Sequence, residues 1–330
     1  MKLDIIRWGI VGCGDVCEVK SGPAFQQIEH SELVAVMRRN GEKAKDFAQR
    51  HKVPKWYDDA DEIIGDPEIN AIYVATPPGS HMEYTLKALK QGKPVYVEKP
   101  MALNYAECRE MVQASEEVNI PLFVAYYRRC LPFFLHVKDW IDREQIGKIR
   151  AVNIRLYKGV DSMDGQQGKD DWRVDPSISG GGHFVDLAAH QFDLLDFIFG
   201  PIAKVHGLAA NQAGWYQAED IVSTSFEFES GIVGSGLWCF SADKNYNLDE
   251  IEILGSKGRI VFPCFSQGPL HMKNSHGVHE KIISHPKHIQ HPLIQTVVNE
   301  LRGGSASPSS GTSAARTTWV MEKILESYYQ

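Results

Sequence analysis

Two segments of the chain carry side chains that could move a proton beside a developing charge. Lys99 follows an apolar run typical of a strand, within Glu98-Lys99-Pro100. Asp186 and His190 are four residues apart, after Gly180-Gly181-Gly182, so a helix there would place both on one face. Oxidising an alcohol needs a base for the hydroxyl proton and a positive charge for the forming alkoxide. Histidine titrates near neutral pH and lysine is cationic, so these residues favour alcohol–carbonyl chemistry.

Each of these residues also has an interpretation without chemistry. Lys99 could be a solvated lysine on a surface turn, and His190 could be a helix histidine satisfied by Asp186. Trp172 and Arg173 precede the glycine run and could present an aromatic face and a cation to a polyhydroxylated substrate. They could equally fasten their loop to the domain. The sequence leaves these alternatives open.

A glycine turn near the N-terminus predicts a dinucleotide site. Gly12-Cys13-Gly14 directly follows a strand-like run, 7–11, and precedes a helix-like segment. In that context backbone N–H groups and the helix dipole can hold a pyrophosphate, so we expect Gly12, Gly14, Asp15 and Val16 to contact it. Cys17 stands where the usual fingerprint has a third glycine. A bare glycine turn is the alternative.

The second strand-like run ends in Met37-Arg38-Arg39, where NAD-binding folds carry an acidic residue for the ribose hydroxyl. Two guanidinium groups suit a 2′-phosphate better, so Arg38 and Arg39 favour NADP over NAD unless they are simply solvated. Thr76, Pro77 and His81 follow another strand and are expected to border the cofactor; a plain proline turn is the alternative.

Apolar runs alternate with helix-like segments through the first part of the chain. This order predicts a doubly wound parallel sheet in a Rossmann domain, residues 1–128. After it, strand-like runs follow one another with one long helix, 183–199, among them, which predicts a mainly antiparallel α+β domain, 129–330. We expect an exposed loop at 303–312 and a final helix at 314–328.

Length and composition exclude several classes of protein. The 330 residues, 43% hydrophobic and 23% charged, suit a globular chain of two domains. The net charge is −7 and no dense basic cluster occurs, so we expect no nucleic-acid partner. The six cysteines form no CxxC pair, which indicates no metal site and fits a reducing cytoplasm. We find no signal peptide or membrane-length apolar run and expect a cytoplasmic protein without membrane contact.

Taken together, these motifs resemble the Gfo/Idh/MocA family of oxidoreductases over nearly the whole chain. The resemblance rests on Gly9-Ile10-Val11-Gly12-Cys13-Gly14, Thr76-Pro77-Pro78 with His81, Glu98-Lys99-Pro100, and Gly180-Gly181-Gly182 followed by Asp186, His190 and Asp193. It implies that Lys99, Asp186 and His190 are the catalytic trio. We also expect Glu98 and Lys99 to border the cofactor, and Trp172 and Arg173 to meet the substrate together with the trio.

The resemblance further implies a cis bond before Pro100, and a terminal helix, 314–328, that packs on the Rossmann domain. It implies an open-faced sheet in the second domain, used for homodimer or homotetramer contacts. Arg38 stands where many members carry an acidic residue, which puts NAD preference in doubt.

The function implied is hydride transfer between NADP or NAD and a secondary alcohol or carbonyl of a sugar, polyol or related small molecule. A non-catalytic dinucleotide-binding regulator and a nicotinamide-assisted glycosidase are the alternatives. Retention of Lys99, Asp186 and His190 argues against the regulator, because a sensor does not need a proton shuttle.

Overall fold

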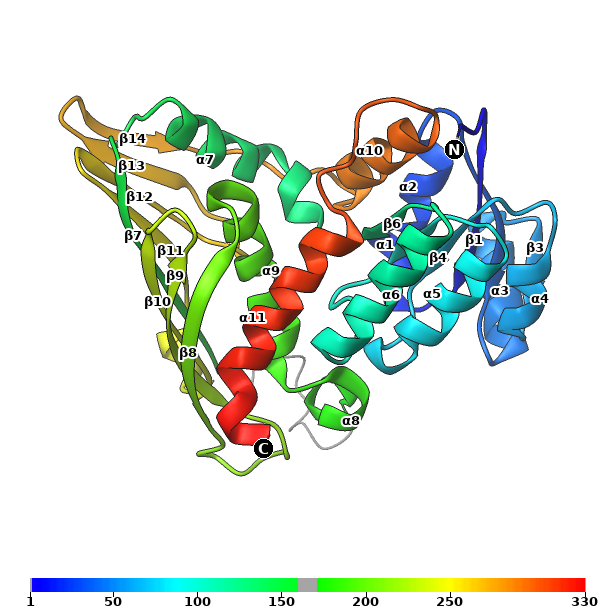
Figure 1. Cartoon of the computed structure of the whole chain (residues 1–330), viewed down its shortest axis with the longest axis horizontal. Helices are drawn as coiled ribbons and strands as arrows, with labels where there is room; N and C mark the ends of the chain where they lie inside the picture. The colour runs from blue at the N-terminus through cyan, green and yellow to red at the C-terminus, as the bar shows by residue number, and fades with distance from the viewer. Residues whose placement is uncertain (1, 160–170, 330) are drawn as a thin grey trace. The chain divides into compact units, whose positions relative to one another are not determined.

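The computed structural model describes residues 2–159 and 171–329, which divide into two units (Figure 1). Unit 1 contains Met1–Leu131 and Pro286–Ala315, and unit 2 contains Pro132–His285 and Arg316–Gln330. The sequence pattern placed everything after residue 128 in one domain. The chain instead returns to unit 1 at Pro286 and leaves it again after Ala315.

Unit 1 is built on a parallel sheet, which has six strands in the described part of the chain, in the order β3-β2-β1-β4-β5-β6. Every residue of β4, β5 and β6 is buried, as expected for strands covered on both faces. The predicted doubly wound sheet is therefore confirmed. Its strands are β1 (Ile6–Val11), β2 (Ser31–Met37), β3 (Lys55–Tyr57), β4 (Ala71–Val74), β5 (Val95–Val97) and β6 (Leu122–Val124).

Polar side chains set where the helices of unit 1 begin. Asn40 Oδ1 accepts a hydrogen bond from Lys43 N–H at the start of α3, and Asn104 Oδ1 accepts one from Glu107 N–H at the start of α6. The short elements β3 and α4 were not predicted, because three and six residues are too few to show an apolar period. The helices are α1 (Asp15–Val19), α2 (Gly22–Gln27), α3 (Gly41–His51), α4 (Ala60–Gly65), α5 (His81–Lys90), α6 (Tyr105–Glu117) and α10 (His291–Leu301).

The segment 303–312 only partly forms the exposed loop that its composition predicted. Residues 303–306 are exposed, but Ser309 is fully buried. Its hydroxyl donates to Val124 O at 2.7 Å, and its carbonyl accepts from Val124 N–H at 3.3 Å. The segment thus satisfies backbone groups of the edge strand β6, which a count of Ser, Gly and Pro cannot reveal.

Unit 2 is built on a second sheet, which has eight strands in the described residues, in the order β14-β13-β12-β11-β7-β10-β9-β8. All neighbours pair antiparallel except β7 and β10, so the mainly antiparallel prediction is confirmed. The short strands β13 and β14 were not predicted. The strands are β7 (Ile149–Gly159), β8 (Ile202–Ala210), β9 (Ile221–Phe228), β10 (Val233–Ala242), β11 (Leu248–Gly255), β12 (Gly258–Phe262), β13 (Leu270–Asn274) and β14 (Gly277–Lys281).

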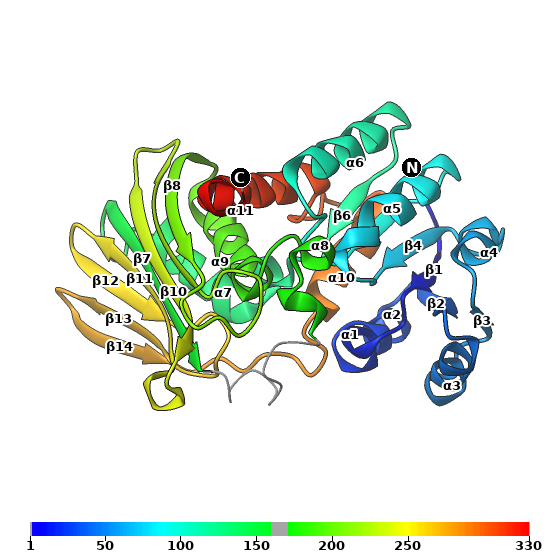
Figure 2. The same cartoon turned by 90° about the horizontal axis from the view of Figure 1, so that it is seen from below.

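One face of this sheet is covered by helices and the other is open (Figure 2). On the covered face, the rings of Phe184 and Trp238 meet edge to face at 5.0 Å. The open face exposes large apolar side chains, with Leu208 77%, Val233 52% and Val278 70% exposed. The predicted open-faced sheet is therefore confirmed. The helices of unit 2 are α7 (Pro132–Asp142), α8 (Pro176–Ser179), α9 (His183–Phe199) and most of α11 (Gly311–Tyr329).

The terminal helix α11 packs closely on β8 within unit 2. A Cβ added to Gly207 would lie 2.5 Å from Ile324 O, so only glycine permits this approach. Arg316 forms a bidentate pair with the buried Asp196 of α9, at 2.7 and 2.8 Å. The predicted packing of this helix on the Rossmann domain stays a prediction.

Candidate active site

The glycine turn in unit 1 has the shape that a dinucleotide needs. Gly12 has φ of +93°, and a Cβ there would lie 2.7 Å from Thr76 Cγ2, so glycine is required at this position. A Cβ on Gly14 would instead meet only Gly12 O, at 4.0 Å. Gly14 therefore leaves its backbone open, next to the N–H groups of Asp15 and Val16 in the first turn of α1. That arrangement fits a pyrophosphate.

The two predicted cofactor arginines follow β2, which ends at Met37. Arg38 is half-buried and Arg39 is exposed. In the described residues neither guanidinium has a carboxylate partner. Burial raises the pKa of Cys13 in the glycine turn to about 11, and the Arg38 guanidinium opposes that rise. Met37 O accepts hydrogen bonds from the N–H groups of Gly12 and Cys13, at 2.9 and 3.0 Å, so Arg38 directly follows a residue that is bonded to the glycine turn.

His81 connects two loops that carry predicted site residues. Its Nε2 lies 2.7 Å from Thr76 O, and its Nδ1 lies 3.0 Å from Pro100 O. The ring is fully buried, and this burial lowers the pKa of His81, so the neutral ring donates to only one of the two carbonyls. Pro77, between these contacts, is half-buried. His81 is thus placed to hold the loops rather than to reach solvent.

The predicted catalytic lysine lies at the carboxyl end of β5. The Lys99-Pro100 peptide bond is cis, which confirms that expectation. Lys99 is half-buried, and its N–H donates to Glu98 Oε2 at 3.1 Å. The Glu98 side chain is buried and accepts hydrogen bonds from other parts of unit 1, so its carboxylate is directed into the protein.

In unit 2, α9 spans His183–Phe199, as predicted, and places Asp186 and His190 on one face. The Asp186 side chain is 24% exposed, whereas His190 is 4% exposed. The His190 ring meets Phe265 edge to face at 6.1 Å. Helix α9 therefore carries a partly accessible carboxylate and a buried imidazole on the same face.

The structure brings Trp172 and Arg173 together with Asp186. The Arg173 guanidinium lies over the Trp172 ring, 4.7 Å from its centroid. Arg173 Nε is 3.8 Å from Asp186 Oδ2, and Nη1 is 3.2 Å from Asp171 Oδ1. An aromatic surface and a cation therefore lie beside one of the predicted catalytic residues.

Sequence reasoning missed the residues that hold the start of α9. Glu219 is fully buried; its Oε1 accepts from Gly182 N–H at 2.9 Å and its Oε2 accepts from Tyr329 OH at 2.5 Å. Burial raises the pKa of Glu219. His183, the first residue of α9, is also buried, and this lowers its pKa to about 4. No local pattern marks Glu219 or Tyr329, since their partners lie far away in sequence.

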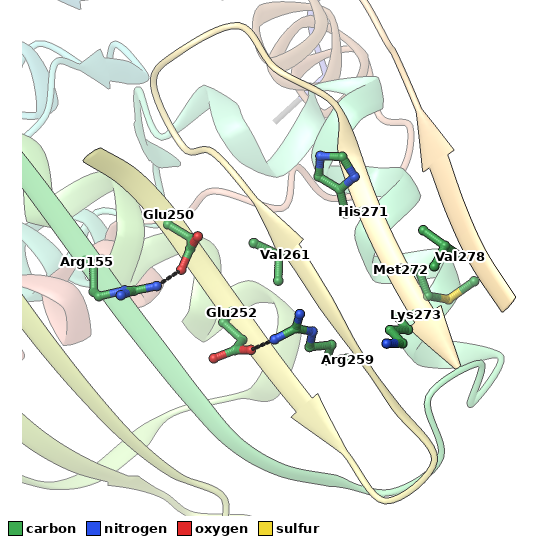
Figure 3. Close-up of a pocket in the computed structure, with 9 residues that line it drawn as sticks. All are labelled: Arg155, Glu250, Glu252, Arg259, Val261, His271, Met272, Lys273 and Val278. Atoms are coloured by element: carbon green, nitrogen blue, oxygen red, sulfur yellow. Dashed lines mark hydrogen bonds and ion pairs between the residues drawn. The ribbon is translucent and has the colours of Figure 1, made fainter. Parts of the chain in front are cut away.

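The open face of the unit 2 sheet has a hollow that is separate from the predicted site residues (Figure 3). It has a volume of about 410 Å³ and is lined by residues of β7 and β11–β14, none of which is a predicted site residue. Arg155 pairs with Glu250, and Arg259 pairs with Glu252 at 3.2 Å. Both arginines are thus already neutralised by carboxylates.

The predicted site residues fall into two groups, each described within its own unit. Unit 1 holds the cofactor residues and Lys99, and unit 2 holds Trp172, Arg173, Asp186 and His190. Within the described ranges, no three His, Cys, Asp or Glu side chains gather as metal ligands. None of the helices described there is both long enough and apolar enough to span a bilayer.

Comparisons with known proteins match both units. Residues 6–126 match the family model described as "Oxidoreductase family, NAD-binding Rossmann fold", and residues 134–261 match the model of the GFO/IDH/MocA C-terminal domain. The chain is 40% identical over 320 residues to oxidoreductase P35 of Formosa agariphila, covering 96% of this chain and 97% of that protein.

Two further similarities are more distant. The chain is 27% identical over 260 residues to 1,5-anhydro-D-fructose reductase of Ensifer adhaerens, covering 77% of this chain and 75% of that one. An oxidoreductase from Agrobacterium radiobacter, solved with NAD⁺, L-tartaric acid and magnesium, superposes with a TM-score of 0.85. It is 20% identical, with 98% of this chain and 96% of the other covered, and it supports the fold.

Proposed function

The chain belongs to the Gfo/Idh/MocA family of NAD-binding oxidoreductases, and from this premise we propose that it oxidises or reduces a sugar-like substrate. The reaction is hydride transfer between a nicotinamide and a secondary alcohol or carbonyl group. The observation that carries the proposal is that a chain matching both family models retains Lys99, Asp186 and His190.

Each of the three residues has a separate role in this proposal. The dinucleotide, when bound, supplies the ring that exchanges a hydride with the substrate carbon. In the oxidative direction His190 accepts the hydroxyl proton, and the Lys99 ammonium stabilises the negative charge on the substrate oxygen. Asp186, on the same face of α9, orients the imidazole or a substrate hydroxyl. In the reductive direction the proton returns to the oxygen.

We propose NADP as the preferred dinucleotide. Arg38 and Arg39 stand at the end of β2, where no carboxylate is present to accept bonds from a ribose hydroxyl. Arg38→Asp should lower kcat/KM for NADP by about tenfold to a hundredfold, because a phosphate–guanidinium contact is lost, and should raise it for NAD. Kinetics with both dinucleotides measure this; unchanged selectivity would remove Arg38 from the cofactor site.

The substrate proposed is a sugar, a polyol or a related small molecule. Trp172 and Arg173 offer an apolar surface and hydrogen-bond donors beside Asp186, which suits a ring carrying several hydroxyl groups. The name of the Ensifer adhaerens relative, an anhydro-sugar reductase, supports this class.

One assay separates the proposed activity from its alternatives. The purified chain is incubated with NADP or NADPH and a panel of sugars and polyols, while nicotinamide absorbance and products are followed. Net change in absorbance with matching product is expected. Glycoside cleavage without net reduction would indicate the nicotinamide-assisted glycosidase, and dinucleotide binding without turnover would indicate the regulator.

We also propose that copies of the chain associate through the open face of the unit 2 sheet. Leu208, Val233 and Val278 are exposed on β8, β10 and β14, so apolar side chains are spread from one edge of this face to the other, and apolar surface left exposed favours association. Light scattering of the purified protein measures the mass in solution. A dimer or tetramer is expected, and a monomer at all concentrations would refute the proposal.

A further inference from the structure

A buried hydrogen-bond network surrounds the glutamate beside Lys99. Glu98 Oε1 accepts from Tyr73 OH at 2.5 Å and from Gln290 Nε2 at 2.6 Å, while Oε2 accepts from Lys99 N–H at 3.1 Å. Tyr96 OH donates to Gln290 Oε1 at 2.9 Å. Tyr73, Tyr96 and Gln290 are fully buried, and Glu98 is 7% exposed. Both atoms of the Gln290 amide group are therefore committed within the network.

Gln290 comes from a distant part of the chain. It lies 192 residues after Glu98, in the segment that returns to unit 1 and at the start of α10. A carboxylate buried without donors is costly, so the donors supplied by this segment decide where the Glu98 side chain can lie. The orientation of the Glu98 carboxylate in turn fixes the peptide N–H of Lys99.

The same segment also contacts the helix that follows the glycine turn. Gln290 N–H donates to Lys20 O at 3.2 Å, and His288 Nδ1 lies 2.7 Å from Val19 O. Val19 is the last residue of α1, which begins directly after Gly14. Residues 288–290 are thus hydrogen-bonded both to the end of α1 and to the Glu98 carboxylate beside Lys99.

We propose that Gln290 is a positioning residue. Through its bond to Glu98, it holds the Lys99 loop in one position relative to the glycine turn. This inference rests on the proposed function, because it takes Lys99 as the group that acts on the substrate. Gln290 itself is buried in the network and touches no reacting atom. Its removal should therefore change the placement of Lys99 more than it changes dinucleotide affinity.

The test uses Gln290→Leu, which removes both amide contacts at similar volume, and Tyr96→Phe, which removes only the donor to Gln290. Gln295→Leu is the matched control, because Gln295 lies on the same helix α10 and its amide donates to the exposed Asn299, away from the network. Three quantities are measured for each folded variant: kcat, the dinucleotide Kd from nicotinamide fluorescence, and the rate at which Lys99 is reductively methylated, read by mass spectrometry against the exposed Lys90.

For Gln290→Leu, kcat should fall about tenfold to a hundredfold, as for a misplaced catalytic group, while Kd changes less than about threefold. The methylation rate of Lys99 should change at least about threefold, since its surroundings are altered. Tyr96→Phe should show smaller changes in the same direction, which keeps the test decisive if Gln290→Leu does not fold. Gln295→Leu should match the wild type.

Wild-type kcat and wild-type Lys99 methylation in folded Gln290→Leu would overturn the inference. A loss of dinucleotide affinity as large as the loss of kcat would also overturn it, because Gln290 would then act on the cofactor site. If the wild type turns over no substrate, the proposed function fails. The methylation rates still decide the role of Gln290 in that case, so the two failures are distinguishable.

Discussion

The Lys99 loop in unit 1 and the start of α9 in unit 2 are each held by hydrogen bonds to a buried glutamate. In each, a buried glutamate accepts a hydrogen bond from a backbone N–H at the predicted site and a 2.5 Å bond from a tyrosine hydroxyl. In each, a donor comes from the last fifty residues of the chain, Gln290 for Glu98 and Tyr329 for Glu219.

The two regions differ in how many hydrogen-bond donors the buried carboxylate has. Glu98 accepts bonds from two side chains and one backbone group. Glu219 accepts one from Tyr329 and one from Gly182, and burial raises its pKa. The start of α9 also carries the buried His183. We therefore expect the α9 side to carry a pH-dependent part of the stability.

The largest effect expected lies on the Lys99 side. Lys99→Met keeps the length of the side chain but removes the charge that would stabilise the substrate oxygen. It should lower kcat by about a thousandfold or more with dinucleotide Kd unchanged. Steady-state kinetics and fluorescence titration measure the two quantities, with the exposed Lys90→Met as control. A variant that keeps the wild-type rate would exclude Lys99 from the chemistry.

The next effect concerns stability on the α9 side. Burial lowers the pKa of His183 from 6.5 to about 4, so the folded chain binds this proton less readily than the unfolded chain. The stabilisation is present above pH 6.5 and is lost as the pH falls towards 4, by about 3 kcal/mol. His183→Phe should lack this loss.

Denaturant unfolding of wild type and His183→Phe between pH 7 and pH 4 measures the difference in free energy. His276→Asn, at an exposed histidine, is the control. The prediction is contradicted if the difference in unfolding free energy between wild type and His183→Phe is the same at pH 7 and pH 4. His183 would then add no pH dependence to the α9 side.

The smallest expected effect concerns the hydrogen bond from Tyr329 to Glu219. An acid whose pKa is raised on folding destabilises the folded chain progressively as the pH rises from its unfolded value towards its folded value. The Tyr329 hydroxyl lowers the pKa of Glu219, so Tyr329→Phe should raise that pKa further. The variant should lose about 1–3 kcal/mol of unfolding free energy at pH 8 and less at pH 4.5.

Tyr328→Phe provides a neighbouring control, because the Tyr328 hydroxyl donates to Gln217 O at an exposed site. Unfolding curves at both pH values measure the difference. Equal losses for the two variants, or a loss independent of pH, would show that Tyr329 contributes only packing.

Local signals predicted the elements that carry the site. Gly12 and Gly14 marked the dinucleotide turn because a strand precedes it and a helix follows it, and periodic apolar residues marked α9 from His183 to Phe199. The spacing of Asp186 and His190 then placed them on one face. These features depend on neighbours within a few residues, and therefore one sequence is sufficient to find them.

Elements with weak local patterns were missed. The strand β14 is exposed throughout and β3 has three residues, so neither carries an apolar alternation. The segment around Ser309 has the composition of a loop but completes the edge strand β6, because its hydroxyl and carbonyl find partners on Val124.

The Rossmann sheet, the family resemblance and the candidate residues for the chemistry could all be predicted from the sequence. The side chains that hold those residues became visible only in the fold: Gln290 on Glu98, and Tyr329 on Glu219. The physical reason is that a buried carboxylate must find its donors wherever the fold brings them. Here those donors lie 192 and 110 residues away along the chain, beyond the reach of any local pattern.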